Sequence, residues 1–134
     1  MDNKEFAKQL EERTKKFAIS VIRLSVLLPA SPEGKILRNQ FTKAGTSVGA
    51  NYREANRARS KADFISRIRI CESEASEAIY WLEIITELDW ISIQKTQPAM
   101  IEASELLAIF TSIGKTLITL NFGNFRHFRH FSSL

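Results

Sequence analysis

An unbroken heptad repeat over residues 64–85 constrains the fold of this chain more than any other feature of its sequence. Its apolar residues follow one another at alternating steps of four and three, which places all of them on one stripe of an α-helix. The stripe consists of Phe64, Ile68, Cys71, Ala75, Ala78, Leu82 and Ile85. Such a repeat predicts a helix that packs at a shallow angle against neighbouring helices.

Three further segments carry apolar residues at helical spacing, whereas strand signals such as Asn-Gly turns are lacking. Together with the heptad segment, these segments predict four helices. The first three cover about residues 3–28, 33–59 and 60–88, and the fourth runs from a start between Ser92 and Pro98 to about residue 121. The connections are short, so sequential helices are expected to be antiparallel. The sequence therefore predicts an all-α fold, an antiparallel up-down-up-down four-helix bundle over residues 1–121, followed by a basic aromatic tail over 122–134.

Two glycines stand inside the second predicted helix. Gly45 and Gly49 each cost roughly 1 kcal/mol relative to alanine in a helix interior. Together with Ala44, Ser47 and Ala50 they form a flat surface. This surface predicts close approach of another helix, and the alternative is a locally loose helix.

A short turn between the second and third helices also predicts their register. If the chain reverses near residues 58–60, residue i of the second helix lies level with about residue 117 − i of the third, because both rise about 1.5 Å per residue. Lys43 is then expected near Glu74, and Arg53 near Phe64.

The chain carries more apolar side chains than the four core stripes use. A helix with apolar residues on two faces is usually buried on both, so the surplus predicts self-association, to a dimer or a larger assembly. The alternative is a thick core with some exposed aliphatic side chains. The surplus residues are Ile65, Ile79, Trp81, Ile84, Trp90, Ile91 and Ile109.

The charge of the chain is unevenly distributed. Residues 53–69 hold six Lys or Arg against two Asp or Glu, whereas residues 70–114 hold one against eight. Arginines near a turn match phosphate oxygens, although they equally suit a solvated turn with local ion pairs. The candidate nucleic-acid-binding residues are Lys43, Arg53, Arg57, Arg59, Lys61, Arg67, Arg69, Arg126 and Arg129.

Nothing in the sequence indicates an enzyme. Cys71 occupies a core position of the heptad, which favours burial over a reactive thiol. The glutamates of the third predicted helix do not occur in the Glu-x-x-His pairs that di-metal bundles use. The two histidines, His127 and His130, lie in the tail. We therefore expect no catalytic residues, no cofactor and no metal.

The expected location is the cytoplasm. The longest apolar runs are too short to cross a bilayer, and the N-terminus does not look like a signal peptide. A single cysteine fits a reducing compartment.

The tail repeats phenylalanine every third residue, at Phe122, Phe125, Phe128 and Phe131, with Arg-His pairs between them. Aromatic rings beside arginine can stack on bases of single-stranded nucleic acid. Four exposed phenylalanines are a liability, however, so we expect the tail to dock on the bundle or on a neighbouring subunit.

Several short motifs resemble a known family. They are Thr46-Ser47-Val48-Gly49-Ala50-Asn51, Glu54, Ser60-Lys61-Ala62-Asp63-Phe64, Glu74, Glu77 and Tyr80-Trp81-Leu82. From Phe17 to about Leu120 the chain resembles the bacterial four-helix-bundle proteins encoded in 23S rRNA intervening sequences. The accessory proteins of diversity-generating retroelements are similar in fold.

The resemblance implies a homopentamer, a barrel of five bundles with a positively charged surface or channel. It also implies nucleic acid, and by likeness to the retroelement proteins a reverse transcriptase, as partners. No enzymatic activity comes with the family.

Two hypotheses follow for function. The first is a non-enzymatic oligomer that binds RNA or DNA through its basic residues. The second is a structural or adaptor homo-oligomer whose basic residues serve contacts with other subunits or with a protein partner.

Overall fold

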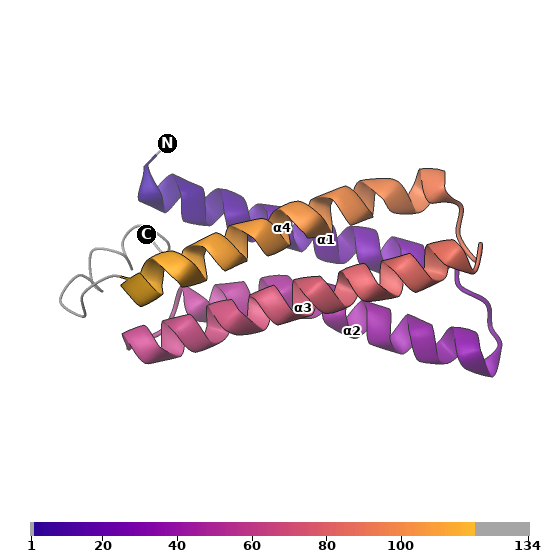
Figure 1. The fold of residues 1–134 in the computed structure, drawn as a ribbon, viewed down its shortest axis with the longest axis horizontal. Helices are drawn as coiled ribbons and strands as arrows, with labels where there is room; N and C mark the ends of the chain where they lie inside the picture. Colours follow the sequence, from indigo (N-terminus) through magenta and orange to yellow (C-terminus); the bar gives the residue numbers. More distant parts are fainter. Residues whose placement is uncertain (1, 120–134) are drawn as a thin grey trace.

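The structure, a computed structural model, describes residues 2–119, with side chains as far as residue 117. Within this range the chain forms four helices and no strand: α1 (Asn3–Ser25), α2 (Pro32–Ala55), α3 (Lys61–Glu87) and α4 (Ile93–Thr119). Sequential helices run antiparallel and lie side by side in one bundle (Figure 1). The predicted all-α class and the four helices are confirmed. The tail over 122–134 and the predicted end of the bundle at 121 lie outside the described residues.

The first three helices begin at capping side chains that satisfy backbone N–H groups of the first turn. The side-chain oxygens of Asp2, Ser31 and Ser60 accept hydrogen bonds from the N–H groups of Glu5, Gly34 and Asp63, at 2.7, 3.1 and 3.1 Å respectively. The third helix, predicted to begin at about residue 60, therefore starts directly after its Ser60 cap.

The first two helices end earlier than predicted. α1 stops at Ser25 rather than residue 28, and α2 stops at Ala55 rather than residue 59. In both cases the chain tightens into three-residue turns, with Leu28 donating to Ser25 and Ala58 donating to Ala55. Leu28 and Ala58 are buried, so each turn bends the chain back toward the core.

The fourth helix starts at Ile93, within the predicted range from Ser92 to Pro98. The carbonyl of Ser92 accepts hydrogen bonds from the N–H groups of Lys95 and Thr96, so the helix begins directly after Ser92, more than one turn before Pro98. Pro98 then lies in the second turn, where its missing N–H leaves one helical hydrogen bond unmade.

The core follows the predicted stripes. All seven heptad residues of α3 are completely buried. They pack with the large buried side chains of the other helices, chiefly Phe17, Phe41, Tyr52, Phe110 and Leu117.

The glycines of α2 mark its closest approach to α1. A Cβ atom at Gly45 would lie 2.5 Å from Cγ2 of Val21, and one at Gly49 would lie 3.0 Å from Oγ1 of Thr14. Real side chains do not tolerate the first distance, so only glycine fits at position 45. The predicted close packing is confirmed over the alternative of a loose helix.

The register of α2 against α3 agrees with the prediction to within two positions. The Cys71 thiol donates to the carbonyl of Val48 at 3.4 Å, and Arg67 Nη1 donates to Oδ1 of Asn51 at 3.2 Å. Lys43 is close enough to Glu74 to lower the pKa of that carboxyl group, although burial raises that pKa overall. Lys43 therefore lies far along α2 from the α2–α3 turn.

The expected surplus of apolar surface lies at other residues than predicted. Ile91 is buried, and the remaining six predicted residues are half-buried along the sides of the helices. The large apolar side chains that are exposed are Ile19, Ile22, Val26, Leu27, Ile36, Ile70, Tyr80, Leu88, Ile93 and Ile101. The period of the core stripe could not identify them, because the exposure of a residue off this stripe depends on which neighbouring helix covers it.

Candidate nucleic-acid interface

The α2–α3 turn presents six basic residues on two helices and the segment between them. We call these residues the turn cluster: Arg53, Arg57, Arg59, Lys61, Arg67 and Arg69. The turn lies at the same end of the bundle as the N-terminus of α1 (Figure 1). The early end of α2 places Arg57 and Arg59 in the connection rather than on a helix, which corrects the helix predicted to residue 59.

Three members of the turn cluster have acidic neighbours. Arg53 lies 3.9 Å from Glu11 of α1, Arg67 lies 3.9 Å from Asp63, and Arg69 lies 3.9 Å from Glu72. These pairs are long and partly solvated, and such pairs contribute little to stability. The three arginines therefore keep most of their capacity to attract another anion.

Arg57 and Arg59 have exposed side chains. Within residues 2–119 neither of them takes part in an ion pair. They are thus the least neutralised cations of the turn cluster.

The other candidate residues do not join this cluster. Lys43 lies ten residues before Arg53 on α2, about 15 Å along the helix, and faces Glu74 on α3. Arg126 and Arg129 lie outside the described residues.

A groove between α1 and α2 borders the turn cluster. Its volume is about 410 Å³, and its base is formed by the small residues Ala18, Gly49 and Ala50. Lys15, Arg53, Arg57, Glu11 and Glu54 line its sides. The same small side chains that let α1 and α2 pack closely thus leave a basic depression on their outer surface.

Sequence reasoning missed the contribution of α1. The exposed cations of this helix are Lys4, Lys8, Lys15, Lys16 and Arg23. The helical spacing of these residues could have placed them opposite the core stripe. They were overlooked because the acidic residues among them lower the net charge of the segment.

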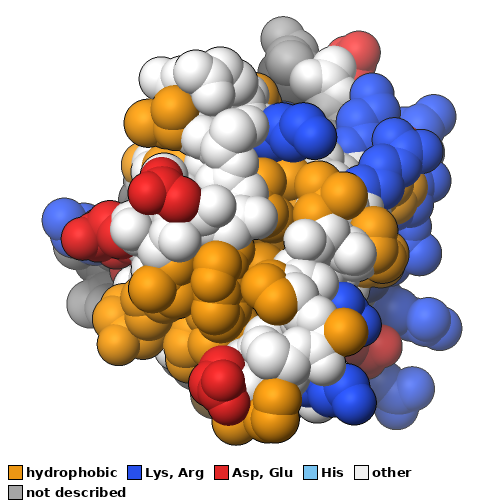
Figure 2. Space-filling view, turned by 90° about the vertical axis from the view of Figure 1, so that its right-hand side faces the viewer, with side chains coloured by type: hydrophobic (Ala, Val, Ile, Leu, Met, Phe, Trp, Pro, Cys, Tyr) orange, Lys and Arg blue, Asp and Glu red, His pale blue; other side chains and the backbone are white. Residues whose placement is uncertain are grey.

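The basic character continues toward the opposite end of the bundle. Figure 2 shows that end, where Lys and Arg side chains gather along the right-hand side of the view and apolar side chains fill its centre. The second half of α3, in contrast, has no Lys or Arg from residue 70 to residue 87. The bundle therefore has a basic side and, along this part of α3, an acidic side.

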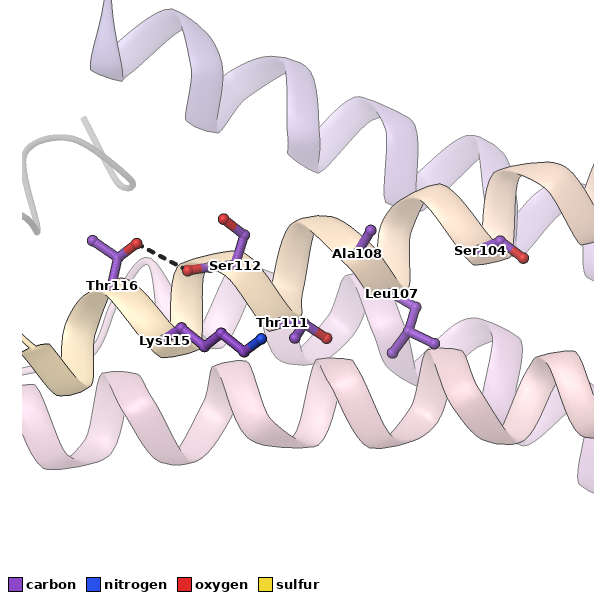
Figure 3. Close-up of a pocket in the computed structure, with 7 residues that line it drawn as sticks. All are labelled: Ser104, Leu107, Ala108, Thr111, Ser112, Lys115 and Thr116. Atoms are coloured by element: carbon purple, nitrogen blue, oxygen red, sulfur yellow. Dashed lines mark hydrogen bonds between the residues drawn. The ribbon is translucent and has the colours of Figure 1, made fainter.

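A shallow hollow of about 500 Å³ lies on the exposed side of α4 (Figure 3). Thr111 donates to Glu72 of α3 at 2.6 Å, and Thr116 donates to the carbonyl of Ser112 at 3.0 Å. Lys115 is the one charged residue among those that Figure 3 labels. The hydroxyl groups of Thr111 and Thr116 make structural hydrogen bonds, and the labelled residues include no acid–base pair.

Two buried titratable groups belong to the core. Burial raises the pKa of the Cys71 thiol to about 12 and also raises the pKa of the Tyr52 hydroxyl. Cys71 is therefore protonated at neutral pH, as its place in the heptad predicts. Among residues 2–119 no three His, Cys, Asp or Glu side chains come together as a metal site.

The four described helices do not resemble membrane-spanning segments. None of them is both long enough and apolar enough to cross a bilayer.

The helix order and the basic turn define an antiparallel four-helix-bundle protein. Residues 8–112 match the family described as 23S rRNA-intervening sequence protein. This match covers most of the chain, so the chain belongs to that family, and the resemblance seen in its motifs is confirmed.

One similar solved structure supports the assignment. It is the 1.70 Å crystal structure of a protein of unknown function from the S23 ribosomal protein family of Bacteroides thetaiotaomicron VPI-5482. The two chains are 31% identical with a TM-score of 0.73, and the match covers 78% of this chain and 97% of the other. No curated protein matches the sequence.

Proposed function

We propose that this protein is a non-enzymatic oligomer that binds nucleic acid, RNA or DNA, through the turn cluster. The supporting observation is the pair Arg57 and Arg59, exposed on a connection and without an acidic partner among the described residues. RNA is the first probe to use, because the family description refers to 23S rRNA.

The chemistry of the cluster suits a phosphate backbone. Guanidinium groups donate paired hydrogen bonds to phosphate oxygens, and counterions released from the nucleic acid favour association. Contacts to phosphate carry no direct sequence information, so binding through the phosphate backbone is expected to show little sequence preference.

Binding of labelled single-stranded and double-stranded RNA and DNA across 50–200 mM salt tests the proposal. Affinity should fall steeply with salt, and the variant Arg57→Glu/Arg59→Glu should bind at least about tenfold more weakly with a salt slope smaller by about two. Lys35→Glu reverses an exposed charge at the far end of α2 and should change affinity much less.

Two results count against this function. One is the absence of binding at low salt to all four probes. The other is an equal loss of affinity in Lys35→Glu and in the turn-cluster variant, which indicates a response to net charge alone.

The second candidate function is a structural or adaptor homo-oligomer. Exposed apolar side chains at the end of the bundle opposite the turn favour it, with Val26 and Ile36 exposed to 65% and 59%. Contiguous apolar surface of this kind marks contacts with other proteins. Basic residues on one copy then meet the acidic α3 of the next, and the family resemblance favours five copies.

Light scattering after size exclusion, with and without RNA, separates the two functions. An adaptor role predicts that Arg57→Glu changes the mass of the particle, whereas a nucleic-acid role predicts an unchanged mass and weaker RNA binding. A stable single-copy particle contradicts the oligomer in both.

We also propose that the protein acts in the cytoplasm and catalyses no reaction. The buried, protonated Cys71 supports the second point, since the nucleophilic form of a thiol is the thiolate. A described residue whose substitution abolishes a measurable turnover contradicts it.

A further inference from the structure

A groove between α1 and α4 gathers three cations from distant parts of the chain. Lys16 and Arg23 come from α1, and Lys95 comes from the first turn of α4. The groove has a volume of about 300 Å³, and all three side chains are exposed. Among residues 2–119 none of the three takes part in an ion pair.

Charged side chains join α1 and α4 beside the groove. Arg13 Nε donates to Oε2 of Glu102 at 3.0 Å, and Arg13 Nη2 lies 3.0 Å from Glu105. The pair of Arg13 and Glu102 lies next to the groove and joins the two helices at that level.

The groove retains a positive charge after its own residues are considered. Glu102 is the one carboxylate that lines it, and Arg13 already occupies both oxygens of that carboxylate. Lys95 stands in the first turn of a helix, where the helix dipole disfavours a cation, and that turn contains no acidic residue. An anion in the groove would relieve the repulsion among Lys16, Arg23 and Lys95.

The base of the groove is apolar. It consists of Phe17, Leu24, Pro98 and Ala99, and the hydroxyl group of Ser20 lies beside them. A ligand that carries negative charge at one end and a flat or apolar body at the other matches both parts.

We infer that this α1–α4 groove binds the phosphate group of a nucleotide through Lys16, Arg23 and Lys95, with the attached sugar and base against Leu24 and Pro98. Arg23 supplies a fork of donors for two phosphate oxygens, and the lysines supply point charges. The site lies apart from the turn cluster and does not depend on it. The nucleotide has two sources, a free mononucleotide or one unit of a single strand.

Calorimetric titration of the full chain with adenosine monophosphate at about 50 mM salt tests the site. Adenosine monophosphate should bind at least about tenfold more tightly than adenosine, because the phosphate meets the cations. Lys95→Glu and Arg23→Glu should each weaken binding at least about tenfold, whereas Lys115→Glu, at the other end of α4, should leave it within about twofold.

The site is overturned if adenosine monophosphate does not bind, or if it binds Lys95→Glu as it binds the unaltered chain. Circular dichroism checks that each variant is folded. If Lys95→Glu is not folded, Lys95→Gln, which adds no negative charge, replaces it. A weakening by Lys115→Glu equal to that of Lys95→Glu also contradicts the site.

Competition identifies the source of the ligand. A single-stranded oligonucleotide that displaces adenosine monophosphate assigns the groove to a strand, and failure to displace it assigns the groove to a free nucleotide. Arg57→Glu/Arg59→Glu separates this inference from the proposed function, since it should retain nucleotide binding even where RNA binding is lost.

Discussion

The two sides of α1 are held to their neighbours in different ways. Toward α2, glycines bring the backbones together, and Gly45 leaves no room for a Cβ atom beside Val21. Toward α4, the ion pair of Arg13 with Glu102 and Glu105 joins helices that otherwise leave a groove. The contact made by small side chains is thus indifferent to salt, whereas the contact made by charged side chains is weakened by salt.

The largest expected effect tests whether a true core underlies the side of α1 that faces α4. Phe17 is buried and lies at the base of the α1–α4 groove. Phe17→Ala should lower the free energy of unfolding by about 3–5 kcal/mol, because it removes a buried ring and leaves a cavity. Urea denaturation measures the change, with Ile19→Ala, at an exposed residue of the same helix, expected within about 0.5 kcal/mol of the unaltered chain. Equal losses in the two variants would show that α1 has no buried face toward α4.

The next effect concerns the side of α1 that faces α2. Gly45→Ala should destabilise the protein by about 1–3 kcal/mol, since the new methyl group overlaps the stiff, buried Val21. Gly114→Ala is the matched control in α4, because the nearest atom to its Cβ, Nε of Arg69, is 3.9 Å away. That variant should be stabilised by up to about 1 kcal/mol through helix propensity. Thermal and urea unfolding of both variants should therefore move in opposite directions.

A smaller effect is expected at the ion pair. Arg13 and Glu102 are exposed to 38% and 31%, so solvent screens much of their attraction. Arg13→Ala should cost less than about 1 kcal/mol, and a double-mutant cycle with Glu102→Ala should give a coupling energy that shrinks as salt is raised. A salt-independent coupling of several kcal/mol would reverse the comparison between the two sides.

The smallest effect is expected at Gly49. Its Cβ would lie 3.0 Å from Oγ1 and 3.1 Å from Cβ of Thr14, so a shift of a few tenths of an ångström relieves the contact. Gly49→Ala gains helix propensity and loses packing, and its net effect should stay within about 1 kcal/mol. A loss as large as that of Gly45→Ala would mean that the whole α1–α2 contact is rigid.

Periodicity was sufficient to predict the helices and their core stripes. The heptad from Phe64 to Ile85 places its apolar residues on one face of an α-helix, and the structure buries all of them. The small residues around Gly45 correctly predicted a close helix contact, because glycine inside a helix is unfavourable without a compensating contact.

The candidate site could be predicted only in part. The turn cluster follows from residues close together in the sequence, whereas the α1–α4 groove joins Arg23 to Lys95 and leaves no local pattern. The ends of α1 and α2 were missed for the same reason, since the burial of Leu28 and Ala58 depends on neighbouring helices rather than on local propensity.

The sequence by itself determined four helices, their buried faces, their order up and down the bundle, and the basic turn. These depend on the 3.6-residue period and on short connections, which are local properties of the chain. Only the tertiary structure decided which cations remain unpaired and which apolar side chains remain exposed. It also decided that α1 packs on α2 through glycines and on α4 through an ion pair, because pairing and exposure depend on distances between residues that the chain order does not bring together.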